Sequence, residues 1–169
     1  IPLWVGEGDL PTPAFIAEAA RRSFEAGETF YTAQRGLPAL REAIGAYMNR
    51  CYGAPGRAFT PDQFFVTTGG MHALQIAMRL LAGPGDEVIV PTPAWPNFEA
   101  ALTISGARTV GVPLELSEIG AGLRWRLDPE RVARAITPRT RALVVNTPAN
   151  PTGWTASVEE LQALLALAR

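Results

Sequence analysis

Short, wholly apolar runs that alternate with helix-forming segments constrain the fold of this chain more than any other feature. The runs are residues 64–66, 88–90, 109–112 and 142–145. Strands that are apolar on both faces are typical of a parallel sheet covered by helices on each side. The pattern therefore predicts an α/β fold, a three-layer αβα arrangement with a mostly parallel sheet.

The helices are expected between and around these runs. A helix should open at Thr12-Pro13, with Thr12 as its cap, and others should begin at the Asp128 cap and near Ser157. The remaining predicted helices cover residues 38–52, 71–81 and 95–104. Residues 60–62 should form a turn or a short helical start, and the polar stretch 115–126 should be irregular.

Composition excludes several classes of function. A net charge of -1 and a pI of about 5.9 argue against a nucleic-acid partner. No apolar run approaches the roughly 20 residues of a membrane helix, and no signal peptide is visible. The lone Cys51 excludes an internal disulfide and a cysteine-based metal site. We expect a cytoplasmic protein with no metal, no membrane partner and no nucleic-acid partner.

Lysine is absent, because all 15 basic residues are arginine. A reaction that needs a lysine Schiff base therefore cannot be completed by this polypeptide alone.

Ligands of parallel α/β sheets bind beyond the carboxyl ends of the strands. The loops at residues 67–71, 91–97 and 146–153 all follow predicted strands, so one cleft could gather them. In the first loop, Gly69 and Gly70 precede a helix start, which suits a phosphate. A plain strand-to-helix turn is the alternative for that loop, and neither a Walker loop nor a GxGxxG motif is present.

The other two loops carry one candidate side chain each. Trp95 could stack on a planar heterocycle, although a core tryptophan between sheet and helix is the better reading of that loop alone. Asn150 could donate a hydrogen bond to an oxygen on a ring, or it could close an Asx turn on its own backbone.

The Asn-Pro-Thr-Gly sequence at residues 150–153, directly after an apolar strand, resembles the class I/II aminotransferases, which are fold-type I pyridoxal-phosphate enzymes. Other matching segments occur in the family's order over nearly the whole chain. They are Gly6-Glu7-Gly8-Asp9 with Thr12-Pro13, Tyr31-Thr32 with Gly36, Thr68-Gly69-Gly70, residues 83–88, and Pro91-Thr92-Pro93 with Trp95.

The resemblance implies roles at the matching positions. Gly69, Gly70 and Met71 would hold the phosphate of pyridoxal 5'-phosphate through the backbone, and Trp95 would stack on its ring. Asn150 would bond the ring's phenolic oxygen and tune the pKa of the imine. Two further roles concern the N-terminal part: Tyr31 would reach the phosphate of a neighbouring subunit in a homodimer, and Gly6 would lie near the substrate carboxylate.

The resemblance also implies transfer of an amino group between an amino acid and a 2-oxo acid. Residues 1–10 would be an N-terminal segment associated with the small domain, and residues 11–169 an incomplete large cofactor-binding domain. Many relatives carry a lysine or a hydroxyl residue where Met71 stands, so one phosphate contact is in doubt. The Schiff-base lysine and the other downstream family residues have no match here, which suggests the front part of a longer protein, inactive alone.

Other functions stay open at this stage. A β-lyase or decarboxylase could use the same scaffold, and a ligand-sensing domain fused to a DNA-binding domain could keep it without catalysis. A nucleotide-binding Rossmann domain is disfavoured by the missing GxGxxG. His72 is interpreted as a partly buried helix residue, and Arg35 as a solvated loop arginine rather than a contact for an acidic substrate.

Overall fold

A computed structural model describes residue 6, residues 8–119 and residues 122–169. The chain forms two compact units, Ile1–Val66 and Thr67–Arg169, which are taken here one at a time. The sequence predicted a segment of the small domain at residues 1–10 and an incomplete large domain at residues 11–169. That boundary is a different one from the division into units, and it stays a prediction.

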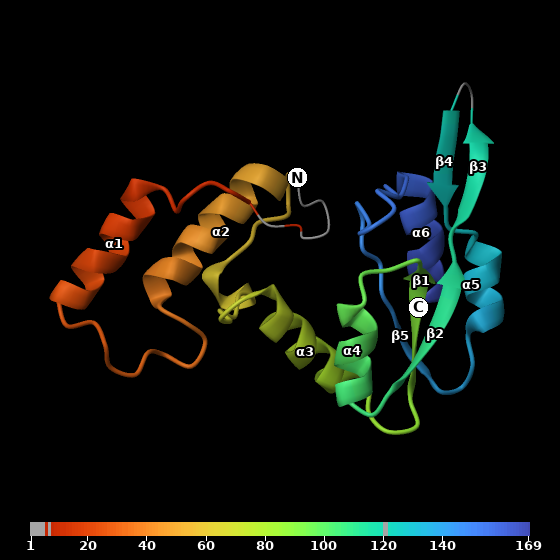
Figure 1. The fold of residues 1–169 in the computed structure, drawn as a ribbon, viewed down its shortest axis with the longest axis horizontal. Helices are drawn as coiled ribbons and strands as arrows, with labels where there is room; N and C mark the ends of the chain where they lie inside the picture. Colours follow the sequence, from red (N-terminus) through yellow and green to blue (C-terminus); the bar gives the residue numbers. More distant parts are fainter. Residues whose placement is uncertain (1–5, 7, 120–121) are drawn as a thin grey trace. The chain divides into compact units, whose positions relative to one another are not determined.

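The second unit is built on a parallel sheet of strands β1 (Glu87–Thr92), β2 (Arg108–Pro113) and β5 (Thr140–Leu143). The strand order is β2-β1-β5, with β1 in the centre (Figure 1). The apolar runs at 88–90 and 109–112 are thus confirmed as strands of a parallel α/β sheet, and the run at 142–145 is confirmed at residues 142 and 143. The backbone of Val144 extends the pairing one residue further by donating to the Ile89 carbonyl.

Helices cover both faces of this sheet because side chains of β1 alternate between the two faces. Val88 and Val90 pack with α3 (Gly70–Leu81) and α4 (Asn97–Ile104). Ile89 packs on the other side with α5 (Pro129–Ala135) and α6 (Val158–Leu167). Each fully buried aliphatic side chain stabilises the unit by about 1.5–3 kcal/mol relative to exposure. The three-layer αβα arrangement is therefore confirmed for this unit.

The helix starts follow their capping residues. Asp128 accepts a hydrogen bond from the Glu130 backbone at 2.9 Å and so caps α5. Ser157 and Glu160 bond each other's backbone N–H groups at the start of α6, which is a capping box. Both predicted starts are confirmed.

The polar stretch at 115–126 is a hairpin, so the expected irregular segment was wrong. Strands β3 (Glu115–Ile119) and β4 (Gly122–Arg126) pair antiparallel. Glu115 lies opposite Arg126, and Leu116 lies opposite Trp125. Pairing of opposite charges and of apolar side chains stabilises such a ribbon even where both strands are largely exposed.

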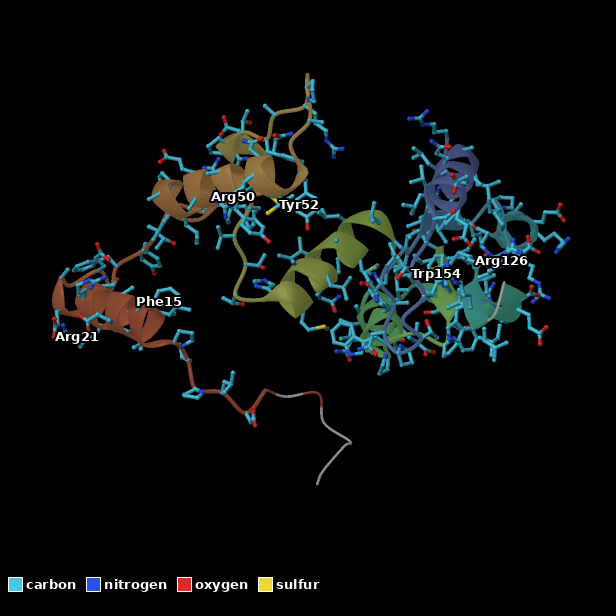
Figure 2. The ribbon with its side chains drawn as sticks, turned by 90° about the horizontal axis from the view of Figure 1, so that it is seen from above. Phe15, Arg21, Arg50, Tyr52, Arg126 and Trp154 are labelled. Carbon is cyan, nitrogen blue, oxygen red and sulfur yellow. The ribbon has the colours of Figure 1, made fainter. Side chains whose placement is uncertain are left out.

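The first unit contains α1 (Ala14–Glu25), α2 (Pro38–Tyr52) and the short 3-10 helix η1 (Pro61–Gln63). The helices confirm the sequence prediction, but Thr12 does not cap α1: the cap position is Pro13, with no side-chain hydrogen bond. The surface of α1 carries Phe15, which is 75% exposed, and Arg21, which pairs with acidic neighbours on the same helix (Figure 2).

Residues 64–66 were expected to be a buried strand, and this was wrong. They form no strand in the described part of the chain, and Phe65 is exposed. The Val66 N–H donates instead to the Arg35 carbonyl at 3.0 Å. A strand needs a ladder of such bonds to a neighbour, and among the described residues this is the one backbone hydrogen bond that the segment makes to a distant part of the chain.

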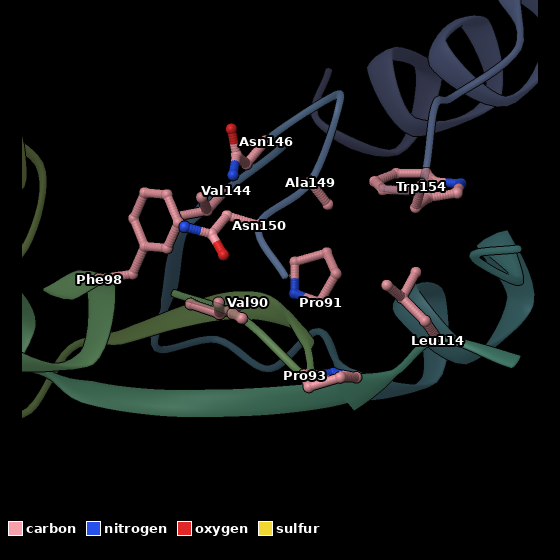
Figure 3. A pocket seen from close by; sticks show the side chains of 11 residues that line it. Val90, Pro91, Pro93, Phe98, Leu114, Val144, Asn146, Ala149, Asn150 and Trp154 are labelled. Carbon is pink, nitrogen blue, oxygen red and sulfur yellow. The ribbon is translucent and has the colours of Figure 1, made fainter. Parts of the chain in front are cut away.

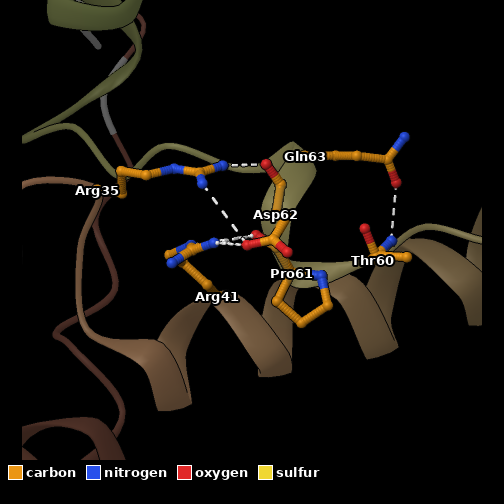
Figure 4. Close-up of polar contacts among 6 residues, drawn as sticks. All are labelled: Arg35, Arg41, Thr60, Pro61, Asp62 and Gln63. Carbon is orange, nitrogen blue, oxygen red and sulfur yellow. Dashed lines mark hydrogen bonds and ion pairs between the residues drawn. The ribbon is translucent and has the colours of Figure 1, made fainter.

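Arg35 is exposed, as expected for a solvated loop arginine, and it also contacts the η1 turn (Figure 4). Its guanidinium lies 3.6 Å from the Asp62 carboxylate and also donates to the Asp62 carbonyl. Arg41 joins the same carboxylate at 2.9 Å. Gly36 follows with a φ of 99°, and a Cβ there would stand 2.3 Å from a Val66 methyl carbon, so only glycine fits.

None of the described helices is both long enough and apolar enough to cross a bilayer.

Candidate functional site

A hollow lies at the carboxyl end of the sheet in the second unit, where the sequence placed the ligand. Loops 91–97 and 146–153 both contribute to its wall (Figure 3). The lining residues are Val90, Pro91, Pro93, Ala94, Phe98, Leu114, Val144, Asn146, Ala149, Asn150 and Trp154. The wall is largely apolar, with two carboxamides among its polar groups.

The loop at 146–153 is rigid because its own hydrogen bonds hold it. The Gly153 N–H donates to the Ala149 carbonyl at 2.7 Å, and the Ala149 N–H donates to the Trp154 carbonyl at 2.9 Å. Thr147 Oγ1 accepts from the Ala156 N–H at 2.8 Å. The loop is thereby fixed without using Asn150.

The Asn150 carboxamide is exposed and makes no hydrogen bond with any residue that the structure describes. The Asx turn proposed as its alternative role is therefore not seen within the described ranges. Figure 3 shows the Asn150 amide beside Phe98 in the wall of the hollow. A free carboxamide in this place can bond a ligand oxygen or nitrogen.

Trp95 lies half-buried at the end of the second loop. Its ring meets Phe98 edge-on, with centroids 5.9 Å apart and an interplanar angle of 86°. Phe98 in turn lines the hollow. Trp95 is thus neither a fully buried core residue nor a direct part of the lining, and its ring-stacking role stays a prediction.

The first loop leads into an uncapped helix. Gly69 occupies the cap position of α3 and has no side chain to accept from the first-turn N–H groups. A Cβ at Gly69 or Gly70 would have nothing within 4 Å, so the approach to these N–H groups is open. The unpaired N–H groups and the positive end of the helix dipole fit a phosphate.

A contact between Thr68 and His72 links this loop to the first turn of α3. Thr68 Oγ1 lies 3.1 Å from His72 Nδ1. The ring is exposed rather than partly buried, so that part of the prediction was wrong. The contact with Thr68 supports a structural role for the ring.

The start of α3 is tied to the second loop through Met71. Asn97 Nδ2, on the first residue of α4, lies 3.3 Å from Met71 Sδ. The two helices are also joined further along, where Gln75 donates to the Ala101 carbonyl at 3.2 Å. The first loop is thus joined to the helix that follows the second loop, but it contributes no residue to the hollow, which gathers only the second and third loops.

Tyr31 and Gly6 belong to the first unit. Tyr31 is fully exposed, and a Cβ at Gly6 would have nothing within 4 Å. The two units are described separately, so the predicted roles of Tyr31 at a partner's phosphate and of Gly6 at the substrate carboxylate stay predictions.

Two residues of this unit were missed by the sequence analysis. Trp154 is only 2% exposed, lines the hollow, and has an indole N–H without a partner among the described residues. Glu87, at the amino end of β1, is 1% exposed. A tryptophan immediately after the Asn-Pro-Thr-Gly sequence was the available signal for the first of these.

Glu87 is surrounded by donors. Arg108 and Arg139 each lie 2.6 Å from its carboxylate, and Thr137 Oγ1 donates to it at 2.8 Å. The hydrogen bond from Arg108, followed by those from Thr137 and Arg139, lowers the pKa of Glu87 from 4.5 to about 2. The adjacent Asp86 accepts from the Gly83 N–H and from Arg141, which lowers the pKa of that carboxyl as well.

No group of three or more metal-ligating side chains is found in the described part of the chain.

The comparison with known families decides what this arrangement belongs to. The sequence model described as "Aminotransferase class I and II" matches residues 1–169. The chain belongs to this family. Membership explains why an uncapped helix start, a tryptophan loop and an Asn-Pro-Thr-Gly loop follow one another around one sheet.

Individual members of the family are similar over nearly the whole chain. An aspartate/prephenate aminotransferase of Thermus thermophilus is 44% identical over 168 residues, which are 99% of this chain and 42% of that protein. An arginine–pyruvate transaminase of Pseudomonas aeruginosa is 43% identical over 89% of this chain and 36% of that protein. The chain therefore spans about two fifths of the length of these curated relatives.

A solved structure agrees with the fold. N-Succinyldiaminopimelate aminotransferase from Mycobacterium tuberculosis superposes with a TM-score of 0.84 at 34% identity, over 97% of this chain and 41% of that one. The α/β class and the parallel sheet thus match those of the family.

Proposed function

We propose that this aminotransferase-family chain forms part of the pyridoxal-phosphate site of an enzyme that moves an amino group between an amino acid and a 2-oxo acid. The observation that carries the proposal is the open, uncapped start of α3 in the same unit as a hollow that presents the free amide of Asn150. The helix start suits a phosphate, and the Asn150 amide suits a polar atom on a ring.

The residues present would each bind a different part of the cofactor. The backbone at Gly69, Gly70 and Met71 would hold the phosphate, because the first-turn N–H groups have no capping side chain. The ring of Trp95 would stack on the pyridine, and the Asn150 amide would donate to its phenolic oxygen. When bound, pyridoxal phosphate supplies an electron sink for the negative charge that develops at the substrate's α-carbon.

The rest of the machinery would come from outside this sequence. The reactive lysine must do so, since the 169 residues contain none. Tyr31 would reach the phosphate site of a second subunit in a homodimer, which fits its complete exposure in the first unit. Gly6 would offer its backbone to the substrate carboxylate. We place the enzyme in the cytoplasm.

The substrate is proposed only as a class. Two relatives of nearly equal identity are named for different amino donors, aspartate in one and arginine in the other. Overall similarity in this segment therefore does not identify the side chain of the amino-acid substrate. The names do support amino-group transfer over elimination or decarboxylation, since each is an aminotransferase.

The test uses the complete protein that contains this sequence. Pyridoxal phosphate is added, the visible absorbance is recorded, and a panel of amino acids follows. The proposal predicts a bound-cofactor band that shifts with at least one amino acid, together with formation of the matching 2-oxo acid. A well-folded protein with no band would contradict it, and release of ammonia instead of amino transfer would show a different reaction.

A further inference from the structure

The side chain of Met71 is the weak point of the phosphate cradle. In the proposed site the backbone at this position faces the cofactor phosphate, yet the thioether has no N–H or O–H to donate. The side chain is 40% exposed, so it lies at the surface of the cradle and not in the core. Backbone N–H groups alone would leave the phosphate with fewer donors than a lysine or hydroxyl residue at this position would give.

A side-chain donor nevertheless stands at this place. Asn97 Nδ2 lies 3.3 Å from Met71 Sδ, and sulfur is only a weak acceptor. Long side chains on a helix point back toward its amino end, so the Met71 sulfur extends toward the start of α3. The Asn97 amide thereby contacts the side chain of the second residue of α3, in the first turn of the helix.

The position of this amide is fixed by rigid elements. Asn97 is the first residue of α4, and α4 packs against α3 through Met78, Ala101 and Leu102, all buried. Gln75 adds hydrogen bonds to the Ala101 carbonyl and to Ser105, each 3.2 Å long. Trp95 stands two residues before Asn97, on the loop that enters α4. Asn97 therefore follows the proposed ring contact, Trp95, by two residues and touches the side chain of Met71, whose backbone is part of the proposed phosphate contact.

We propose that Asn97 donates a hydrogen bond to the cofactor phosphate and so supplies the side-chain contact that Met71 lacks. The inference rests on the proposed cofactor site and adds a binding residue to it. The amide would exchange a weak sulfur acceptor for a phosphate oxygen, and hydrogen bonds to charged groups are roughly twice as strong as neutral ones.

The experiment measures binding of two ligands by the 169-residue chain, pyridoxamine 5'-phosphate and pyridoxamine. Their ratio of dissociation constants isolates the phosphate and does not depend on turnover. Asn97→Ala should reduce the preference for the phosphorylated ligand by about tenfold or more, as expected for loss of a hydrogen bond to a charged group. Asn97→Asp should reduce it further, because a carboxylate repels the phosphate.

Two variants control the result. Gln75→Ala removes two hydrogen bonds between the same helices away from the cradle and should reduce the preference much less than Asn97→Ala does. Met71→Thr in the Asn97→Ala background returns a donor and should restore part of the preference. Each variant is first checked for an unchanged circular dichroism spectrum.

The outcomes separate the two proposals. If the unmodified chain shows no preference for the phosphorylated ligand, the cofactor site itself is wrong. If it shows the preference and Asn97→Ala keeps it, the site stands and the role of Asn97 is overturned. An equal loss in Gln75→Ala would also overturn that role, because it would trace the effect to helix packing.

Discussion

At the amino end of β1 the charged side chains are bonded to one another, whereas at its carboxyl end the polar side chains are left free. Glu87 is enclosed by two arginines and a threonine, and Asp86 is joined to Arg141. At the other end the Asn150 amide has no partner within the described ranges, and α3 starts without a cap. These two ends belong to the same short strand.

The difference separates stability from binding. Pairing at the amino end joins the starts of β1, β2 and β5, because Glu87 and Arg108 are the first residues of β1 and β2 and Arg139 directly precedes β5. At the carboxyl end, the exposed Asn150 amide and the uncapped start of α3 hold no other part of the chain and are available to a ligand. Substitutions of the polar side chains at the two ends should therefore affect different measurements, whereas the buried Trp154 at the carboxyl end should affect stability.

The largest effect on stability is expected at Trp154, a buried residue that lines the hollow at the carboxyl end of the sheet. Trp154→Ala should lower the free energy of unfolding by about 3–5 kcal/mol, because it removes a buried ring and leaves a cavity. Urea denaturation of the chain measures this. Trp154→Phe is the control, and it should cost less than about 1.5 kcal/mol because it keeps an aromatic ring and removes an unpartnered N–H. If Trp154→Phe lowered the free energy of unfolding as much as Trp154→Ala, the prediction would be contradicted, and the indole N–H would be needed for stability.

The next effect is expected at Glu87, and it depends on pH. The pKa of Glu87 is lowered from 4.5 to about 2 in the folded chain, so its stabilising contribution is complete above pH 4.5 and is lost as the pH falls toward 2. Glu87→Gln should therefore lower the melting temperature at neutral pH, and the difference from the unmodified chain should shrink below pH 4.5.

Glu115→Gln is the matched control for that variant. Glu115 pairs with Arg131 on the surface, where both side chains are about two fifths exposed, so little change is expected. Affinity for pyridoxamine 5'-phosphate should stay the same in both variants. A loss of affinity in Glu87→Gln would break the separation between the two ends of the strand.

The smallest effect on stability is expected at Asn150. Asn150→Ala should leave the melting temperature unchanged, because the amide holds nothing in the described structure, and should weaken pyridoxal-phosphate binding about tenfold. Fluorescence titration of the chain measures the affinity. Asn146→Ala is the same change on the same hollow and should weaken binding less. A fall in melting temperature in Asn150→Ala would give Asn150 a structural role.

The sequence predicted those parts of the fold whose partners lie within this chain. The apolar runs at 88–90 and 142–145 became strands because they pair with each other. The run at 64–66 did not, because periodicity records that a segment can be a strand and says nothing of whether a neighbour is present. The hairpin at 115–126 was missed because its apolar residues are few and lie among charges.

The site was predictable to a similar degree. The loops at 91–97 and 146–153 follow strands that the apolar runs mark well, so their convergence could be foreseen. The loop at 67–71 follows no strand in the described structure and contributes no residue to the hollow. The Glu87 cluster could not, because its arginine partners lie 21 and 52 residues along the chain. The burial of Trp154 and the contact between Asn97 and Met71 depend on how helices and loops pack, which spacing alone does not record.

The central claim is that this sequence builds a cofactor cradle that lacks its own lysine. Amino transfer from an amino-acid panel to 2-oxo acids should be measured for the complete protein and for the 169-residue chain, both with pyridoxal phosphate. The account predicts transfer by the complete protein and none by the chain, although the chain binds the phosphorylated cofactor. Transfer by the purified chain alone would contradict it, because the sequence contains no lysine.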